Sequence, residues 1–193
     1  MNNLVNQESS AELYWIPLGA GAHIVRFSGK AFEPIAAKIH HRSREKLYHS
    51  ALQLFTPNGR YTIEQAPVVN KDVSERGVVA EGPVGMRILG GLAIFRYEVR
   101  CWKEGNIPDL DTAAGQPTVV TRNEEQIDKI LKGIVDVPTP VWGRDELHTG
   151  EMWNSNSVIS WVLEQSGIDA STFRPPDGGR APGWQAGIKV AHR

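Results

Sequence analysis

Two β-rich runs joined by a tight turn constrain this chain more than any other feature of its sequence. The run LYHSALQLF is followed by TPNG and then by RYTIEQAPV. An Asn-Gly pair between two such runs is a strong short-range signal for a β-hairpin. A two-residue loop at Asn58-Gly59 places Leu54 opposite Ile63. The sequence therefore predicts two antiparallel strands, near 47–55 and 61–68.

Successive strand side chains alternate between the two faces of a sheet, so the hairpin has an apolar face and a more polar face. The apolar face carries four large side chains: Tyr48, Leu52, Leu54 and Ile63. The other face carries small or polar residues: His49, Ala51, Gln53 and Glu64. His49 is a candidate for a functional histidine, because its imidazole would be both oriented and accessible there. The alternative is a structural histidine bonded to the backbone.

Three further segments extend the hairpin into a larger sheet, near 12–18, 77–87 and 93–102. The last segment alternates between apolar and charged residues. Cys101 falls on its apolar side, so we expect a small buried hydrophobe and no reactive thiol. The stretch between 104 and 118 is expected to be a loop.

Helices are predicted on both sides of this strand region. A helix in the thirties ends at His40-His41, where the two histidines are better explained as a solvated helix end than as a metal site. The capping-box spacing of Thr121 and Glu124 indicates the start of a second helix, which we expect to end near Val135. A third runs from about 156 to 166. The predicted fold is α+β, with a central antiparallel sheet and helices packed on it.

Size and composition limit the functional classes. The 193 residues suffice for one domain, which we place at 11–193 after a flexible N-terminus at 1–10. The net charge of -1 gives no attraction to nucleic acid. No membrane span, secretory signal, metal site or cofactor is predicted. We expect a cytoplasmic protein that binds a small molecule or a peptide, and the sequence leaves its oligomeric state open.

The densest group of polar and aromatic residues lies just before the helix at 156–166. A helix N-terminus carries unpaired N–H groups and partial positive charge, so it can hold an anion or a developing oxyanion. The same polar residues can also do no more than cap a core helix. The predicted ligand-contacting residues, which include one from the Gly/Pro-rich tail loop, are Trp142, Arg144, Asp145, Trp153, Asn154, Asn156 and Trp184.

The order of His49 in LYHSALQL and Asn154-Ser155 in WNSNSVISWVL resembles the circularly permuted papain-like domains. In lecithin retinol acyltransferase-like proteins and permuted relatives of the NlpC peptidases, a strand histidine precedes an Asn-Cys-x-x-Phe motif that opens a helix. The resemblance covers roughly residues 45–165. It implies an amide or ester hydrolase, or an acyltransferase, with Ser155 as nucleophile, His49 as general base and Glu64 as orienting group. GEMWNSNSVISW also resembles uncharacterised bacterial domains, which implies no activity.

Ser155 stands where the resembled family has its cysteine. A hydroxyl needs a better-placed base and oxyanion donors than a thiol does. The chain is therefore a serine enzyme, an inactive relative that only binds, or a protein whose cysteine was deliberately replaced. In the simple hairpin register, Glu64 lies about 13 Å from His49, so a direct contact requires a bulge or a longer loop.

Three functions remain open from the sequence. The first is a Ser-His hydrolase or acyltransferase. The second is a non-catalytic binding module with an aromatic and arginine-lined cleft. The third is a structural domain in which Arg144 pairs with Asp145 or Glu151 in a buried network.

Overall fold

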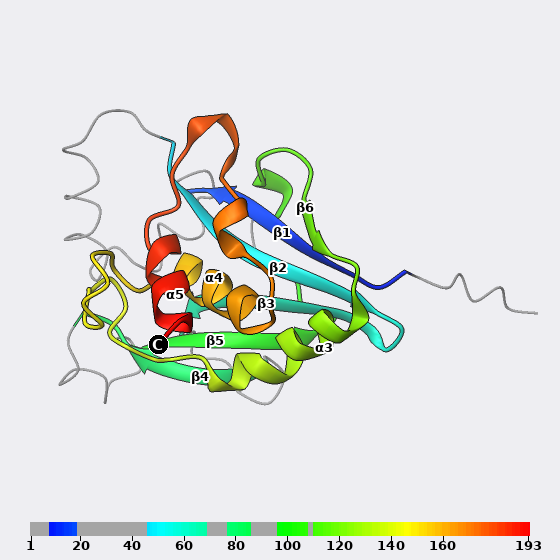
Figure 1. Ribbon diagram of the computed structural model, residues 1–193, viewed down its shortest axis with the longest axis horizontal. Helices are drawn as coiled ribbons and strands as arrows, with labels where there is room; N and C mark the ends of the chain where they lie inside the picture. Colours follow the sequence, from blue (N-terminus) through cyan, green and yellow to red (C-terminus); the bar gives the residue numbers. More distant parts are fainter. Residues whose placement is uncertain (1–7, 19–45, 69–76, 86–95, 108–109) are drawn as a thin grey trace, which may run out of the picture.

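A computed structural model describes residues 8–18, 46–68, 77–85, 96–107 and 110–193, and every structural statement below concerns these residues. Six strands form one antiparallel sheet in the order β4-β5-β3-β2-β1-β6 (Figure 1). The strands are β1 (Ser10–Pro17), β2 (Tyr48–Thr56), β3 (Gly59–Pro67), β4 (Val78–Pro83), β5 (Arg96–Lys103) and β6 (Thr118–Thr121). The sequence predicted five of them; β6 begins at the end of the segment expected to be a loop.

Three helices cover one face of this sheet (Figure 1). They are α3 (Glu124–Gly133), α4 (Ser155–Gln165) and α5 (Trp184–Ala191). Short 3-10 turns accompany them: η4 (Leu110–Thr112), η5 (Ile134–Asp136), η6 (Ala170–Thr172) and η7 (Pro176–Gly178). The predicted α+β class is therefore confirmed. No helix in the described part of the chain is long and apolar enough to cross a membrane. The predicted helix ending at His40-His41 lies outside the described residues.

The hairpin register differs from its prediction by two residues, and the loop lies one residue earlier. Thr56 pairs with Gly59 and Leu52 pairs with Ile63, so the loop is Pro57-Asn58. Thr56 accepts a hydrogen bond from Asn58 N at 3.2 Å and donates one to Gly59 O at 2.8 Å. Gly59 adopts φ 119, which an L side chain rarely tolerates. Side chains alternate between the two faces of a strand, so a register shift of two residues keeps each one on its predicted face of the hairpin.

The two faces of the sheet bury different groups. The helix side carries the large core, which includes Leu13, Tyr48 and Val99 together with side chains from all three helices. The opposite side holds a smaller apolar cluster centred on Ile16, Ala51 and Ile107. Strand alternation thus separates a mainly apolar helix side from a second side with more polar residues.

The sheet opens at the end where α4 begins. β2 starts at Tyr48 and β3 runs on to Pro67, but within the described ranges their pairing extends only from Gly59 opposite Thr56 to Ile63 opposite Leu52. Figure 1 shows the two strands separating toward this end, with α4 and α5 in front of them. Asn156, in the first turn of α4, donates through Nδ2 to Tyr48 O at 3.0 Å. The helix therefore begins against the divergent end of the sheet.

The C-terminal tail, expected to be a loop, contains α5, which packs closely on α4. Ser157 Oγ donates to Gly183 O and Ser160 Oγ donates to Trp184 O, both at 2.7 Å. Gly187 faces this contact, and a Cβ built there would overlap Ser157 O and Ser160 Oγ. Two serines and one glycine thus allow the helix backbones to approach. The run from Trp184 to Ala191 contains Gly187 and two β-branched residues, so helix propensity alone did not indicate this helix.

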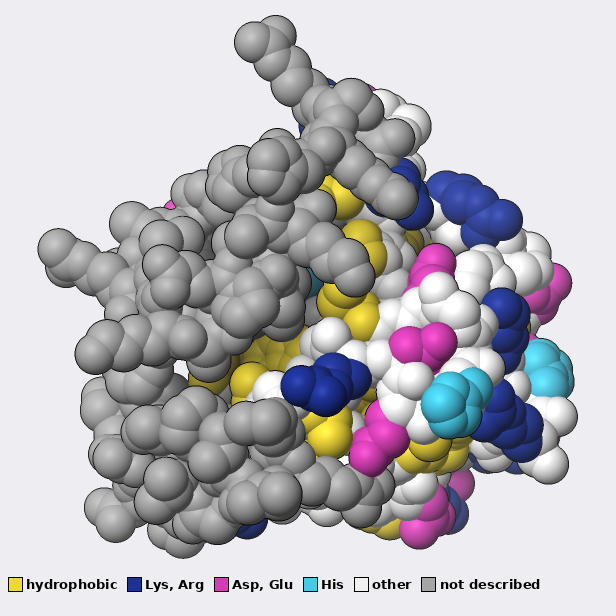
Figure 2. Space-filling model, turned by 90° about the vertical axis from the view of Figure 1, so that its left-hand side faces the viewer, with side chains coloured by type: hydrophobic (Ala, Val, Ile, Leu, Met, Phe, Trp, Pro, Cys, Tyr) yellow, Lys and Arg dark blue, Asp and Glu magenta, His cyan; other side chains and the backbone are white. Residues whose placement is uncertain are grey.

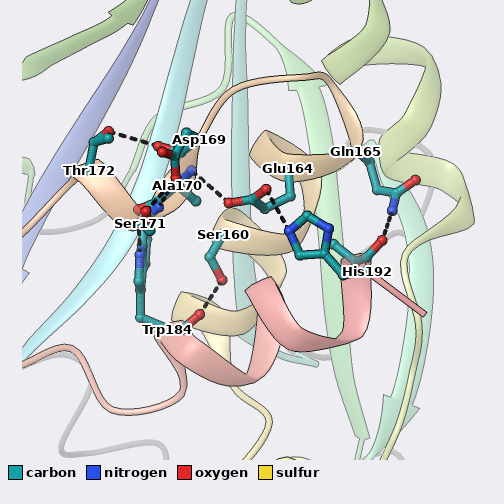
Figure 3. Close-up of polar contacts among 10 residues, drawn as sticks. Ser160, Glu164, Gln165, Asp169, Ala170, Ser171, Thr172, Trp184 and His192 are labelled. Atoms are coloured by element: carbon teal, nitrogen blue, oxygen red, sulfur yellow. Dashed lines mark hydrogen bonds and ion pairs between the residues drawn. The ribbon is translucent and has the colours of Figure 1, made fainter.

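Polar contacts at the other end of α4 tie the same layer together (Figure 3). Glu164 accepts from Ala170 N at 2.8 Å and lies 3.1 Å from His192 Nε2. Trp184 Nε1 donates to Ala170 O at 3.0 Å. Helix α3 begins slightly later than its predicted capping box implies, because the side chain of Asn123, not Thr121, accepts from the first helical N–H groups.

Candidate functional site

The polar loop before α4 is held mainly by its own carboxylates. Asp145 accepts hydrogen bonds from Thr149 N at 2.6 Å and Gly150 N at 2.8 Å. These bonds, the one from Thr149 N foremost, lower the pKa of Asp145 below its ordinary value. Glu151 accepts from Gly183 N at 2.8 Å and so caps α5. Both predicted acidic residues therefore bond backbone groups, and no buried network with Arg144 forms among the described residues.

Arg144 is an exposed residue of this loop. Its carbonyl accepts from Trp153 N at 2.9 Å, which fixes the backbone next to α4. Its guanidinium takes part in no ion pair within the described part of the chain. Of the residues predicted to contact a ligand, Arg144 and Asp145 carry exposed charges, and Asp145 already accepts hydrogen bonds from its own loop.

The tryptophans predicted to line a cleft mostly belong to the core. Trp153 is 2% exposed and Trp184 is 4% exposed. Trp184 packs on Trp15 with ring centroids 4.9 Å apart. Trp142 is half-buried and meets Tyr97 edge-on at 5.7 Å. An aromatic cluster in the sequence is equally compatible with a cleft and with a core, and here packing explains most of it.

The three residues at the start of α4 have different roles. Asn154 is the N-cap: its side chain accepts from Asn156 N at 2.9 Å, and its own N–H donates to Ser157 Oγ in a capping box. Ser155 is buried, and its hydroxyl takes part in no hydrogen bond within the described residues. Asn156 spans the gap to the sheet and to Pro182 O, at 2.9 Å.

The predicted catalytic groups are not joined to one another. Ser155 belongs to α4 on the helix side, whereas His49 follows core residue Tyr48 on β2 and pairs with Ile16, whose side chain is buried on the opposite side. Glu64 shares that opposite face with His49 but pairs with Arg100, with 3.1 Å between Oε1 and Nη1. Burial of the Glu64 carboxyl raises its pKa, and this effect outweighs the lowering by the nearby Arg100.

Unpaired polar atoms occur on the helix side of the sheet, on both strands that diverge there and at the start of α4. Four buried residues on the helix side have side-chain atoms with no hydrogen-bond partner in the described structure: Ser50 Oγ, Gln65 Nε2 and Oε1, Trp153 Nε1, and Asn156 Oδ1. Ser50 lies two residues beyond Tyr48, whose carbonyl binds Asn156. Gln65 lies in the part of β3 that no longer pairs with β2. Buried polar atoms are normally satisfied, so these atoms lack partners that a bound molecule could supply.

Ser50 and Gln65 were missed in the sequence, although a signal for them existed. Each is a polar residue at a strand position whose neighbours two residues away, Leu52 and Ile63, are apolar core residues. A polar residue at such a position must find a partner or bear a desolvation cost. It therefore marks a site more specifically than the aromatic residues do.

Figure 2 views the molecule from the side on which the loop before α4 lies in Figure 1. Hydrophobic side chains are visible in the middle of this face, with acidic, basic and histidine side chains beside them. Among the residues that the structure describes, no group of three or more His, Cys, Asp or Glu side chains is arranged to hold a metal ion.

Comparison with known proteins adds no identification: no family model, curated protein or solved structure matches this chain. The resemblance to permuted papain-like domains stays a prediction. The function must therefore be argued from the site itself.

Proposed function

We propose that this protein is a binding module for a small uncharged ligand, held where β2 and β3 separate beneath the start of α4. The observation that carries the proposal is the group of unpaired buried atoms on Ser50, Gln65, Trp153 and Asn156. Each buried polar atom without a partner costs about 1–3 kcal/mol. A ligand that supplies the missing partners would recover that free energy on binding.

The chemistry of these groups defines the ligand. The Gln65 amide offers a donor and an acceptor, Asn156 Oδ1 accepts, Trp153 Nε1 donates, and the Ser50 hydroxyl does both. None of the four carries a charge. A molecule with amide or hydroxyl groups satisfies such a set, whereas a carboxylate or an ammonium would lose its hydration without gaining a counter-charge.

Ser155 supports a second candidate function on the same site. Ser155 is a mostly buried residue at the N-terminus of α4, but its hydroxyl oxygen is not among the fully buried atoms and makes no hydrogen bond with described residues, so it is available to a ligand carbonyl. This favours the serine hydrolase or acyltransferase that the family resemblance implies. A fluorophosphonate probe tests this second function. Labelling of the wild type that is lost in both Ser155→Ala and His49→Ala would favour the enzyme. If the wild type is not labelled, the enzyme is excluded and only the binding function remains.

Gln65→Met tests the binding proposal. Methionine keeps the length of glutamine and removes the unpaired amide, so the free energy of unfolding of the ligand-free protein should rise by about 1–2 kcal/mol. Fragments with both a donor and an acceptor should shift the indole N–H resonance of Trp153 saturably in the wild type. The same fragments should bind at least about fivefold more weakly to Gln65→Met.

Gln53→Met is the matched control, because Gln53 also has an unpaired buried Nε2 but lies on the opposite face of the sheet. It should leave fragment binding at Trp153 unchanged. The binding proposal fails if no neutral fragment produces a saturable shift, or if Gln65→Met and Gln53→Met weaken binding equally.

A further inference from the structure

The face of the sheet opposite the helices carries a second set of polar side chains. Glu64 pairs with Arg100 of β5, and Thr62 pairs with Trp102 of β5 and with Gln53 of β2. Residues 62 and 64 are two apart, so these side chains leave the same face in two adjacent rows. This face is distinct from the site beneath α4.

Arg100 is the centre of this set. Its Nη1 donates to Glu64 Oε1 at 3.1 Å and its Nε donates to Glu98 Oε2 at 3.0 Å. Both ion pairs are buried, where each charge needs all its hydrogen bonds satisfied. The third guanidinium nitrogen, Nη2, is buried and has no partner in the described structure.

Three other buried donors of this face have no hydrogen-bond partner within the described ranges: Gln53 Nε2, Trp102 Nε1 and Arg60 Nε, the last of which lies 3.8 Å from Glu104 Oε2. Gln53 is 3% exposed and Arg100 is 6% exposed. Thr62 needs no further partner, because its hydroxyl donates to Gly105 O at 2.9 Å. The unsatisfied atoms of Arg100, Gln53 and Trp102 are thus all donors, in contrast to the mixed donors and acceptors beneath α4.

The charges around these donors select a neutral acceptor. A carboxylate ligand would meet Glu64 and Glu98, which already neutralise Arg100. Burial, which raises the pKa of Glu64, opposes further negative charge in the same place. A carbonyl oxygen accepts hydrogen bonds without adding charge.

We propose that this face binds an uncharged ligand through a carbonyl oxygen, whose two lone pairs accept hydrogen bonds from Gln53 Nε2 and Trp102 Nε1 beside the Arg100 guanidinium. The ring of Trp102, 5.7 Å from the Arg100 guanidinium carbon, provides apolar surface for the rest of the ligand. The ligand class is a ketone, ester or tertiary amide, which has acceptors and no donors.

The probe for this site is N,N-dimethylacetamide, titrated into the full-length, ¹⁵N-labelled protein and followed by NMR. The Trp102 indole N–H and the Gln53 carboxamide resonances, assigned with Trp102→Phe and Gln53→Met, should shift saturably. Gln53→Met should weaken the probe's affinity about fivefold, as expected for one lost hydrogen bond. Gln65→Met should leave it unchanged.

Acetate, which adds a charge to the same carbonyl framework, should bind more weakly than the neutral probe. If Gln53→Met does not fold, Trp102→Phe provides the same affinity comparison through the Gln53 resonance. Shifts that remain linear to the highest concentration, wild-type affinity in the donor-deleted variant, or equal binding of acetate would each overturn the proposal. The two sites use different residues. The result of this titration is therefore independent of the fragment titration at the site beneath α4.

Discussion

Substituting Gly187 by alanine should destabilise the protein, although alanine is the better helix former. The added Cβ would fall well inside 3.0 Å of Ser157 O and Ser160 Oγ, and both serines hold α5 through their hydroxyls. Overpacking costs about 1–3 kcal/mol and a lost hydrogen bond about 1 kcal/mol. The gain in helix propensity offsets about 1 kcal/mol, which leaves a net loss of about 1–3 kcal/mol.

Thermal unfolding followed by circular dichroism measures this loss. For a chain of this size, each kcal/mol shifts Tm by about 2–4 °C, so Gly187→Ala should unfold about 2–12 °C below the wild type. Gly133→Ala is the control: Gly133 is also helical, with φ -77, and no described atom lies within 4 Å of the position that a Cβ would occupy there. It should raise Tm slightly. If both variants are more stable than the wild type, the close packing of α4 on α5 is wrong.

Three further predictions concern single side chains. Burial raises the pKa of the Cys101 thiol to about 11, so iodoacetamide at pH 8 should label the unfolded protein much faster than the folded one; equal rates would contradict this. Glu151→Ala should lower the free energy of unfolding by about 1 kcal/mol in urea titration, because Gly183 N–H loses its acceptor. Burial raises the pKa of Glu64, so the folded state holds this proton more tightly than the unfolded state. The stability of the wild type relative to Glu64→Gln should therefore increase as pH falls from that raised pKa toward 4.5, and a pH-independent difference would exclude this.

Local patterns in the sequence were sufficient for most of the sheet and for the start of α4. Alternation assigned Cys101 to the apolar side of β5, where it packs against the core. The cap residues before α4 were recognised as such, and Asn154 fulfils that role. These features depend on neighbours within a few residues, which is why they can be predicted from the sequence.

Features that depend on tertiary contacts could not be predicted in the same way. The hairpin loop moved to Pro57-Asn58, because the position of an Asn-Gly pair does not fix which two residues remain unpaired. The separation of β2 from β3 has no local signal. Because of this separation, Ser50 pairs only with β1 and Gln65 only with β5, and the two residues do not pair with each other.

The candidate site found in the structure differs from the one predicted from the sequence, for a related reason. The sequence brought His49 and Ser155 together by their order in the chain, but the side of the sheet on which each lies is set by strand alternation and by helix placement. The structure instead points to uncharged polar residues at core positions. Such residues carry a free-energy cost in the ligand-free protein that a suitable ligand can remove.

The most direct test of the binding site beneath α4 is a high-resolution crystal structure of the protein soaked with the neutral fragment that binds best in the NMR titration. The proposal predicts density for the fragment between the Gln65 amide and Asn156 Oδ1, within hydrogen-bonding distance of both. Ordered water alone at this position, a fragment bound elsewhere, or Gln65 bonded to protein groups would contradict it.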